Sequence, residues 1–177
     1  MILWIGSNGL IQKCLNNFEE RTGHMAVLEI VKEGDPVLRQ KAEPVTQVTK
    51  RIRKLIKDML ETMNLADGVG LAAPQVGISQ RIIVVDVGEG PVALINPKID
   101  EASGEEIDVE GCLSIPGTFG YVERAQTVTV SGLNECGRST RIKAEGLFAR
   151  ALQHEIDHLN GVLFIDRALE IEAQREE

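Results

Sequence analysis

His154 and His158 lie four residues apart in the sequence QHEIDH (residues 153–158), with Glu155 between them. On a helix, residues with this spacing lie on one face, one turn apart, so both imidazoles can bind one metal ion. Glu155 lies beside the pair without being needed as a ligand, which suits a general base acting on metal-bound water. Residues 148–152 are mostly apolar, which favours a buried helix over residues 146–159 rather than a surface helix with two solvated histidines.

A hydrolytic site of this kind needs a third protein ligand and leaves a fourth position open for water. Cys112, in the sequence EGCLS (residues 110–114), is the strongest candidate because a thiolate binds a borderline-soft divalent ion better than a carboxylate does. Cys136 lies in a polar turn and Cys14 in the leading segment, and neither has neighbours that indicate a ligand. A lone cysteine is most often a small buried apolar residue, so the assignment depends on the fold bringing Cys112 to the histidines.

The chain has 177 residues and a formal net charge of −8. This charge argues against a general nucleic-acid or anionic-membrane binder. No apolar run approaches the roughly 18 residues that a membrane span requires. The length predicts one catalytic domain, which we expect over residues 25–177.

We interpret residues 1–24 as an N-terminal arm or an upstream extension. Their apolar residues fall at helical spacing, which indicates a short amphipathic helix. No basic residue precedes the first apolar stretch and no small-residue cleavage site follows it, so a signal peptide is not expected. Without a basic, serine-rich leader, the sequence favours a bacterial-type protein of the cytoplasm over an organellar form.

The remaining pattern predicts an α+β domain. Apolar residues recur at helical spacing from residue 52 to residue 63, which predicts an amphipathic helix with a basic outer face. Strands are predicted at residues 81–87, 92–96, 127–130 and 140–144, the last two joined as a hairpin. We therefore expect small antiparallel β-sheets surrounding a central helix that carries the metal ligands.

Residues 68–75 (GVGLAAPQ) form a glycine-rich segment after the first predicted helix of the domain. They lack the GK[ST] ending of a phosphate-binding loop and do not lie between a strand and a helix. Two glycines followed by small residues can let a backbone approach a ligand closely. The Gln75 side-chain amide is a donor of the kind that stabilises an oxyanion. Taken alone, the segment would favour a plain tight turn.

Together, GVGLAAPQ, EGCLS and QHEIDH occur in an order and at separations that resemble the peptide deformylase family. Residues 34–39 (GDPVLR) are also similar to the N-terminal segment of that family. The resemblance extends from residue 27 to residue 167, and no motif position is substituted. Deformylases remove the formyl group from the N-terminal formyl-methionine of nascent chains in bacteria and organelles, so the resemblance implies this activity.

By this resemblance, Cys112, His154 and His158 bind one divalent metal ion with water in the fourth position. Glu155 takes the proton from that water and later passes it to the leaving amine, while the hydroxide attacks the formyl carbon. The native metal of the family is usually Fe²⁺, with Zn²⁺ often present in purified material, and a Cys/His/His set does not choose between them by spacing. An iron–thiolate site open to solvent is expected to be sensitive to oxygen.

The resemblance also implies how the substrate is held. The Gln75 side chain and the Leu113 backbone N–H would stabilise the oxyanion together with the metal. The substrate backbone would bind as an added strand, and the methionine side chain would enter a pocket that His154 helps to line. The implied substrate-binding residues are Val69, Gly70, Gly111, Leu147 and Ala151. Arg150 stands where the family often has an apolar pocket residue, and we expect its aliphatic stem to substitute for that wall.

The implied partners are N-formylmethionyl nascent peptides. Some deformylases dock on ribosomal RNA through a basic helix that follows the metal-binding helix. Residues 167–177 hold four glutamates against two arginines, and a phosphate backbone would repel this negative charge. We expect at most weak ribosome association and no direct nucleic-acid binding.

Two other functions are compatible with parts of the pattern. A zinc endopeptidase of the HExxH type would place its third ligand, a glutamate or histidine, on a helix downstream of His158, where only 19 residues follow. A catalytically silent metal-binding or ribosome-associated module would need neither Glu155 nor Gln75. Both residues are present, which favours an enzyme.

Overall fold

The computed structural model describes residues 26–173. The helices are α2 (Lys50–Leu65) and α3 (Gly146–His158), with short 3₁₀ turns η1 (Pro36–Arg39), η2 (Ala73–Val76) and η3 (Phe164–Asp166). The strands are β1 (Gly70–Ala72), β2 (Ile82–Val85), β3 (Val92–Ser103), β4 (Glu106–Cys112), β5 (Ile115–Arg124), β6 (Thr127–Leu133), β7 (Ser139–Glu145) and β8 (Glu170–Ala173). The short helix predicted within residues 1–24 lies outside the described residues.

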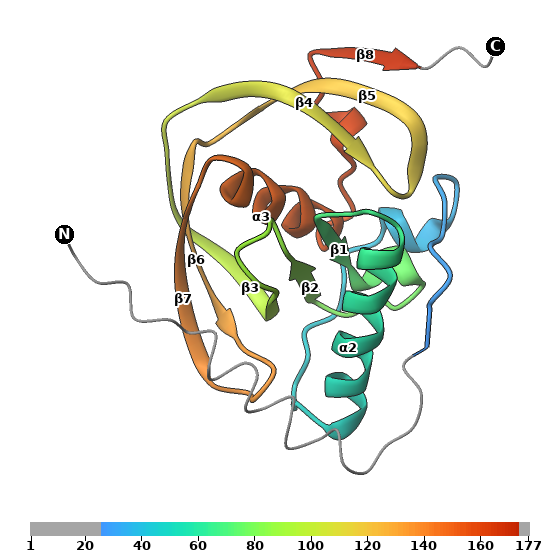
Figure 1. Ribbon diagram of the computed structural model, residues 1–177, viewed down its shortest axis with the longest axis vertical. Helices are drawn as coiled ribbons and strands as arrows, with labels where there is room; N and C mark the ends of the chain where they lie inside the picture. The colour runs from blue at the N-terminus through green and yellow to red at the C-terminus, as the bar shows by residue number, and fades with distance from the viewer. Residues whose placement is uncertain (1–25, 174–177) are drawn as a thin grey trace.

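The strands form two antiparallel sheets. The larger has the order β1-β2-β3-β6-β7 and the smaller the order β4-β5-β8. Helix α3 lies between them, with β4 and β5 arching over one side of it and the larger sheet on the other (Figure 1). The predicted α+β class, with antiparallel sheets around a central helix, is confirmed.

Helix α2 forms where the apolar spacing predicted it. Thr49 caps its first turn, its side chain accepting a hydrogen bond from the Ile52 backbone N–H, as capping threonines do. Its apolar face is buried against β1 and β2 in one of the hydrophobic clusters of the protein, which includes Ile56, Met59 and Met63. Within residues 26–173, neither α2 nor α3 is long and apolar enough to cross a membrane.

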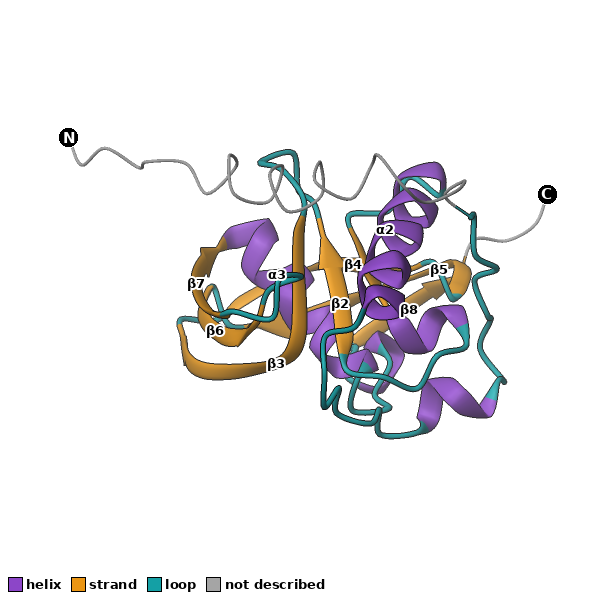
Figure 2. Ribbon diagram, turned by 90° about the horizontal axis from the view of Figure 1, so that it is seen from below, coloured by secondary structure: helices purple, strands orange, loops and turns teal. Residues whose placement is uncertain are grey.

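Strand β2 is buried on both faces because a helix covers each of them. Ile82 and Val84 belong to the cluster with α2, whereas Ile83 and Val85 belong to the cluster with α3. Side chains alternate between the faces of a strand, so a strand between two helices needs four consecutive apolar residues here. Figure 2 shows β2 passing between the two helices. This arrangement fixes α3, and with it the two histidines, against the centre of the larger sheet.

The predicted hairpin at residues 127–130 and 140–144 is confirmed as β6 and β7, which pair from Thr127 opposite Glu145 to Leu133 opposite Ser139. The strand predicted at residues 92–96 is longer than expected. Its first part, up to Ile95, pairs with β2, and from Ile95 to Ser103 the strand pairs with β6 across two register shifts. The hairpin β4–β5 and the strand β8 were not predicted, although β4 carries the EGC of the cysteine motif.

Candidate metal centre

Three side chains with metal-binding atoms meet between α3 and the end of β4. His154 and His158 come from the C-terminal half of α3, and Cys112 is the last residue of β4. Their ligand atoms all lie within 4.8 Å of one another, and within residues 26–173 no other such group is found. The fold thus brings together the three residues that the sequence suggested as ligands, although 42 residues of chain separate Cys112 from His154.

A break in the pairing of β4 places Cys112. The register with β5 shifts between Gly111 and Cys112, and such irregularities re-aim a side chain. The Cys112 Sγ lies 3.3 Å from Nε2 of His158. It also accepts hydrogen bonds from the Ser114 backbone N–H and from Nε2 of Gln75, both at 3.4 Å. Two donors directed at one sulfur fix the position of the Cys112 side chain beside the histidines.

The two histidines lie on one face of α3, with ring centroids 5.0 Å apart. Nδ1 of His154 lies 2.9 Å from Oε2 of Glu110, so this carboxylate holds the Nδ1 proton and leaves Nε2 to face the site. A carboxylate behind a histidine is the usual outer partner of a metal ligand, because it fixes the tautomer and ring orientation. His158 is 1% exposed.

The charges around the histidines favour a bound cation. Burial lowers the pKa of His154, but hydrogen bonds with Cys112 and Glu110 and the charge of Glu155 outweigh this and raise that pKa to about 10. Surroundings that stabilise a proton on this ring stabilise a metal ion in the same way. Burial holds the pKa of His158 well below its ordinary value. His158 is therefore a neutral imidazole, the form that binds metals.

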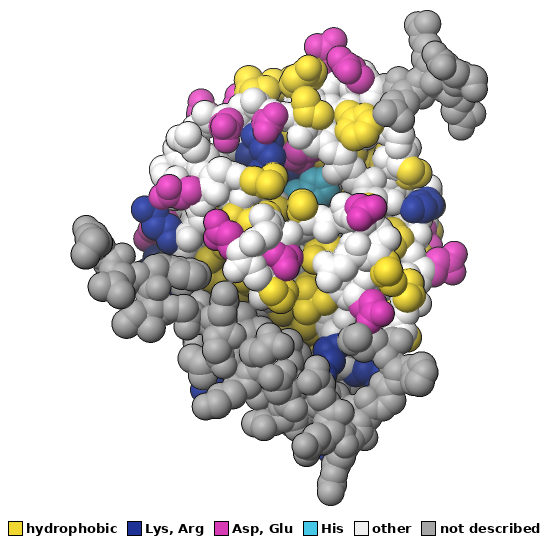
Figure 3. Space-filling model, viewed as in Figure 1, with side chains coloured by type: hydrophobic (Ala, Val, Ile, Leu, Met, Phe, Trp, Pro, Cys, Tyr) yellow, Lys and Arg dark blue, Asp and Glu magenta, His cyan; other side chains and the backbone are white. Residues whose placement is uncertain are grey.

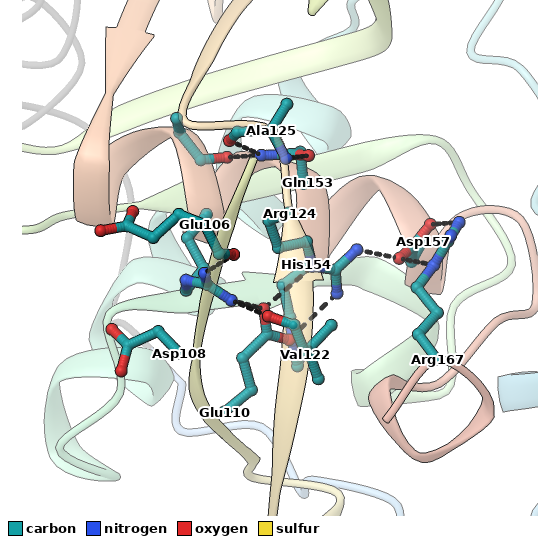
Figure 4. Close-up of polar contacts among 12 residues, drawn as sticks. Glu106, Asp108, Glu110, Val122, Arg124, Ala125, Gln153, His154, Asp157 and Arg167 are labelled. Carbon is teal, nitrogen blue, oxygen red and sulfur yellow. Dashed lines mark hydrogen bonds and ion pairs between the residues drawn. The ribbon is translucent and has the colours of Figure 1, made fainter. Parts of the chain in front are cut away.

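An ion-pair network that is buried except for Arg167 supports His154 from behind (Figure 4). Glu110 accepts hydrogen bonds from Nε and Nη2 of Arg124 at 2.9 and 3.0 Å, and Arg124 also binds Asp157. Arg167 donates to Asp157 at 2.8 Å. Burial raises the pKa of Glu110, but the hydrogen bonds with His154 and Arg124 outweigh it and lower that pKa to about 2. Glu110 is therefore a carboxylate at any physiological pH.

Glu110, Arg124 and Asp157 were not predicted from the sequence as site residues. One signal was available: Glu110 stands two residues before Cys112, which places both on the same face of a strand. Asp157 stands next to His158 within the helical motif. Nothing in the spacing links Arg124 to either, because it lies on β5, a strand that was not predicted.

Arg150 is buried and its guanidinium turns away from solvent. Nη1 donates to Oε1 of Glu110 and to the Val122 carbonyl, both at 2.9 Å, and Nη2 donates to the Glu106 carbonyl at 2.8 Å. Arg150 also lines the cavity beside the metal centre. The sequence predicted only that the aliphatic stem of Arg150 lines the pocket, and the three hydrogen bonds of its guanidinium were not predicted.

Glu155 is buried and lies against Gly70. A β-carbon at Gly70 would lie 2.3 Å from Oε1 of Glu155, so only glycine fits there while the carboxylate keeps its place. Among the described residues, Oε2 of Glu155 has no hydrogen-bond partner. Burial raises the pKa of Glu155, His154 lowers it, and the net result is about 7. Gly70, which the resemblance assigns to substrate binding, thus also leaves space for the Glu155 carboxylate.

Gln75 lies on η2, directly after the edge strand β1, and is 1% exposed. Its Oε1 accepts a hydrogen bond from the Ala72 backbone N–H at 2.8 Å, which fixes the orientation of the amide. Its Nε2 therefore faces the site and lies 3.4 Å from Cys112 Sγ and 3.3 Å from Ser114 Oγ. The segment 68–75 is thus a strand and a 3₁₀ turn that present an amide donor to the cysteine.

A cavity of about 360 Å³ opens beside these groups, within the usual size for small-molecule and peptide-residue pockets. The residues proposed from the sequence for substrate binding and catalysis all line it: Val69, Gly70, Gln75, Gly111, Leu113, Leu147, Ala151 and Glu155. Cys112 and His154 also line it. In Figure 3 a histidine is visible in a hollow among hydrophobic side chains. The site is therefore reachable from solvent through a largely apolar opening.

Comparison with known proteins agrees with this geometry. The family model described as polypeptide deformylase matches residues 27–174. The peptide deformylase of Halothermothrix orenii is 62% identical over 149 residues, which cover 83% of this chain and 97% of that protein. The peptide deformylase of Carboxydothermus hydrogenoformans is 59% identical over 144 residues, covering 81% of this chain and 95% of that protein.

Solved structures show the same fold. The crystal structure of the Thermotoga maritima peptide deformylase matches with a TM-score of 0.80 and 51% identity, covering 82% of this chain and 99% of that one. A class I type b peptide deformylase from Acinetobacter baumannii, solved with Met-Ala-Ser bound, matches with a TM-score of 0.78 and 38% identity, covering 81% and 99%. The chain thus belongs to the peptide deformylase family and is a metallohydrolase that removes the N-formyl group from newly made polypeptides.

Proposed function

We propose that Cys112, His154 and His158 hold one divalent metal ion, Fe²⁺ in the cell, with Zn²⁺ able to replace it in purified protein. The observation that carries the proposal is the donor set itself: one sulfur and two imidazoles whose ligand atoms lie within 4.8 Å. The 3.3 Å between Cys112 Sγ and His158 Nε2 is close to the about 3.5 Å that separates sulfur and nitrogen ligands of a tetrahedral ion. When bound, such an ion supplies Lewis-acid activation of a water and of the formyl carbonyl.

Glu155 acts as the general base and then as the general acid. It takes a proton from the attacking water and delivers it to the amine that leaves as the formyl C–N bond breaks. Its pKa of about 7 suits both transfers, because a group that titrates near the working pH can accept and donate a proton with similar ease. Contact with Gly70 holds the carboxylate in position.

Gln75 and Leu113 stabilise the oxyanion that develops on the formyl oxygen. The hydrogen bond from Ala72 holds the Gln75 amide rigid, so its Nε2 needs little reorganisation to donate in the transition state. The Leu113 backbone N–H, which we assign to the same task, follows Cys112 directly in the chain, and Leu113 lines the cavity. The contact with Ala72 therefore pre-organises the Gln75 donor at the side of the cavity near Cys112.

The substrate is an N-formylmethionyl peptide bound as an added strand. β1 and β4 are edge strands of their sheets, and edge strands carry unpaired backbone groups that can bind an extended chain. Val69, Gly70 and Gly111 supply these groups at the mouth of the cavity. Leu147, Ala151 and the stem of Arg150 line the pocket for methionine. The Acinetobacter baumannii relative with Met-Ala-Ser bound supports this class of ligand.

We further propose a catalytic domain over residues 25–177 with residues 1–24 as a separate arm, acting in the bacterial cytoplasm. The family match over residues 27–174 and the bacterial relatives support this proposal. Nascent peptides are the partner. Ribosome association is at most weak and direct nucleic-acid binding is absent, in keeping with the net charge of −8.

The test is hydrolysis of formyl-Met-Ala by protein purified without oxygen, with metal analysis of the same sample. We expect release of formate, about one equivalent of metal per chain, and loss of activity on exposure to air as the thiolate ligand is oxidised. Acetyl-Met-Ala is the matched control, because it differs from the substrate by one methyl group. Full activity after complete removal of metal would overturn the proposed centre.

A further inference from the structure

Arg150 occupies a position from which it can act on the metal centre without touching it. It precedes His154 by four residues on α3, so the two side chains lie on the same face of the helix. Both contact one carboxylate, that of Glu110: Arg150 Nη1 donates to Oε1 and His154 Nδ1 lies against Oε2. The guanidinium is thus hydrogen-bonded to Glu110, and Glu110 in turn contacts the proposed metal ligand His154.

The strands hold Arg150 in this position. Besides Glu110, its guanidinium donates to the carbonyl of Val122 on β5 and to that of Glu106 on β4. Three acceptors from two strands leave the planar group a single orientation. Arg150 and Glu110 are 5% and 6% exposed, so solvent does little to screen their interaction.

The Glu110 carboxylate binds two arginines and also contacts His154, so its orientation has to be held. Its Oε1 receives Arg124 Nε as well as Arg150 Nη1, and its Oε2 receives Arg124 Nη2 as well as His154. Without Arg150 the carboxylate could rotate toward Arg124 and draw Oε2 away from His154. The imidazole would then lose the contact that fixes its tautomer and the aim of Nε2.

We infer that Arg150 is a positioning residue for the metal centre, acting through Glu110 on His154. Its two ends have separate roles: the aliphatic stem lines the cavity, and the guanidinium fixes the carboxylate that orients the ligand. This inference rests on the proposed metal centre and adds to it a residue that the family resemblance would assign to the pocket wall alone.

The experiment measures Zn²⁺ affinity by competition with a chelating dye for the whole protein and two substitutions at this site. Arg150→Met keeps an unbranched apolar stem and removes the guanidinium. We expect it to raise the apparent Kd for Zn²⁺ about 10-fold, the lower end of the range for outer partners of metal ligands. Arg150→Lys keeps a donor for Glu110 and should recover part of this loss. Arg141→Met, at an exposed arginine paired with Asp100 and Glu101, is the control and should leave the Kd unchanged.

A double-mutant cycle tests the route. If Arg150 acts through Glu110, then Arg150→Met in a Glu110→Gln background should change the Kd for Zn²⁺ less than about twofold. In that background the contact between the Glu110 carboxylate and His154, through which Arg150 would act, is already lost. The sulfur-to-metal absorption band of the Co²⁺-loaded protein should shift in Arg150→Met and in Glu110→Gln, but not in Arg141→Met.

Several results would overturn the inference. A lower melting temperature with an unchanged Kd and Co²⁺ band would make Arg150 a structural residue only, and full additivity in the cycle would exclude the route through Glu110. If Arg150→Met fails to fold, the same comparison of Kd and Co²⁺ band is made with Arg150→Lys. If the wild-type protein itself bound no Zn²⁺, the proposed centre would fail and this inference with it.

Discussion

Gly70 and Glu155 share a space that admits no further atom: a β-carbon at Gly70 would lie 2.3 Å from Oε1 and 2.9 Å from Cδ of the glutamate. The glycine stands on the edge strand β1 and the glutamate on α3, so the contact joins the larger sheet to the metal-binding helix. The proposed base, Glu155, can therefore keep its position only because residue 70 has no side chain.

Gly70→Ala should therefore lower kcat about 100-fold, since a displacement of about 1 Å at a reacting group can cost this much. Metal content should stay near that of the wild type, because no ligand moves. Gly68→Ala is the comparison: its β-carbon would meet Cδ1 of Leu113 at 2.8 Å, the far end of a flexible side chain, and kcat should fall far less. Equal losses in the two variants would contradict the role of the Gly70 contact.

Glu155→Ala should remove most turnover and leave the metal in place. Loss of a general base typically costs about 10²–10⁴-fold in rate, whereas Glu155 contributes no atom to the ligand set. Steady-state kinetics and metal analysis on one preparation separate the two effects. If the variant lost its metal, Glu155 would be a ligand and the assignment of the base would be wrong.

Gln75→Ala should lower kcat about 10²–10³-fold with little change in KM, because an oxyanion donor acts mainly on the transition state. Ser114→Ala removes only one of the contacts of the Gln75 amide and keeps the Oε1 contact with Ala72. The decrease in kcat should therefore be much smaller in this variant. A Gln75→Ala variant with a raised KM and an unchanged kcat would show that the amide only positions substrate.

Cys112→Ser should weaken metal retention, since a hydroxyl is a poorer ligand than a thiolate for this class of ion. Dialysis against a chelator should strip the variant at concentrations that leave the wild type loaded. Cys136→Ser, in the turn between β6 and β7, should retain its metal. The opposite pattern, with metal lost in Cys136→Ser and kept in Cys112→Ser, would refute the ligand set.

The parts of the fold that could be predicted from the sequence are those with simple periodicity. Helix α2 buries one face against the larger sheet, and β6 and β7 are joined by a short polar turn, so their patterns are local. Helix α3 is buried on most sides between the two sheets, and its position was indicated by the spacing of the two histidines and the apolar residues before them. Strand β4 shows why the smaller sheet was missed. Its apolar Val109 is 46% exposed and its charged Glu110 is 6% exposed, because the apolar face borders the substrate cavity and the charged face meets Arg124 and Arg150.

The candidate site also has a part that could be predicted from the sequence and a part that could not. The three motifs indicated the proposed ligands, the base and the amide donor, because each type of chemistry requires particular residue types. The supporting network could not be predicted, since Arg124 pairs with residues 14 and 33 positions away in the sequence and only the fold shows these contacts. Arg150 was misjudged for the same reason: its three acceptors all lie on β4 and β5.

The acidic C-terminal residues disfavour binding to ribosomal RNA. Residues 167–177 hold four glutamates against two arginines, and two of these glutamates, Glu170 and Glu172, are exposed on β8. Deleting residues 168–177 would also remove β8, which pairs with β5, so charge substitutions are the better test. We expect little co-sedimentation of the wild type with ribosomes at physiological salt, and more with the variant Glu170→Lys/Glu172→Lys, since the phosphate backbone attracts cations and repels anions. The variant Glu170→Gln/Glu172→Gln controls for loss of the carboxylates alone. Firm, salt-resistant co-sedimentation of the wild type that the lysine variant abolishes would mean that this acidic strand is itself a docking element.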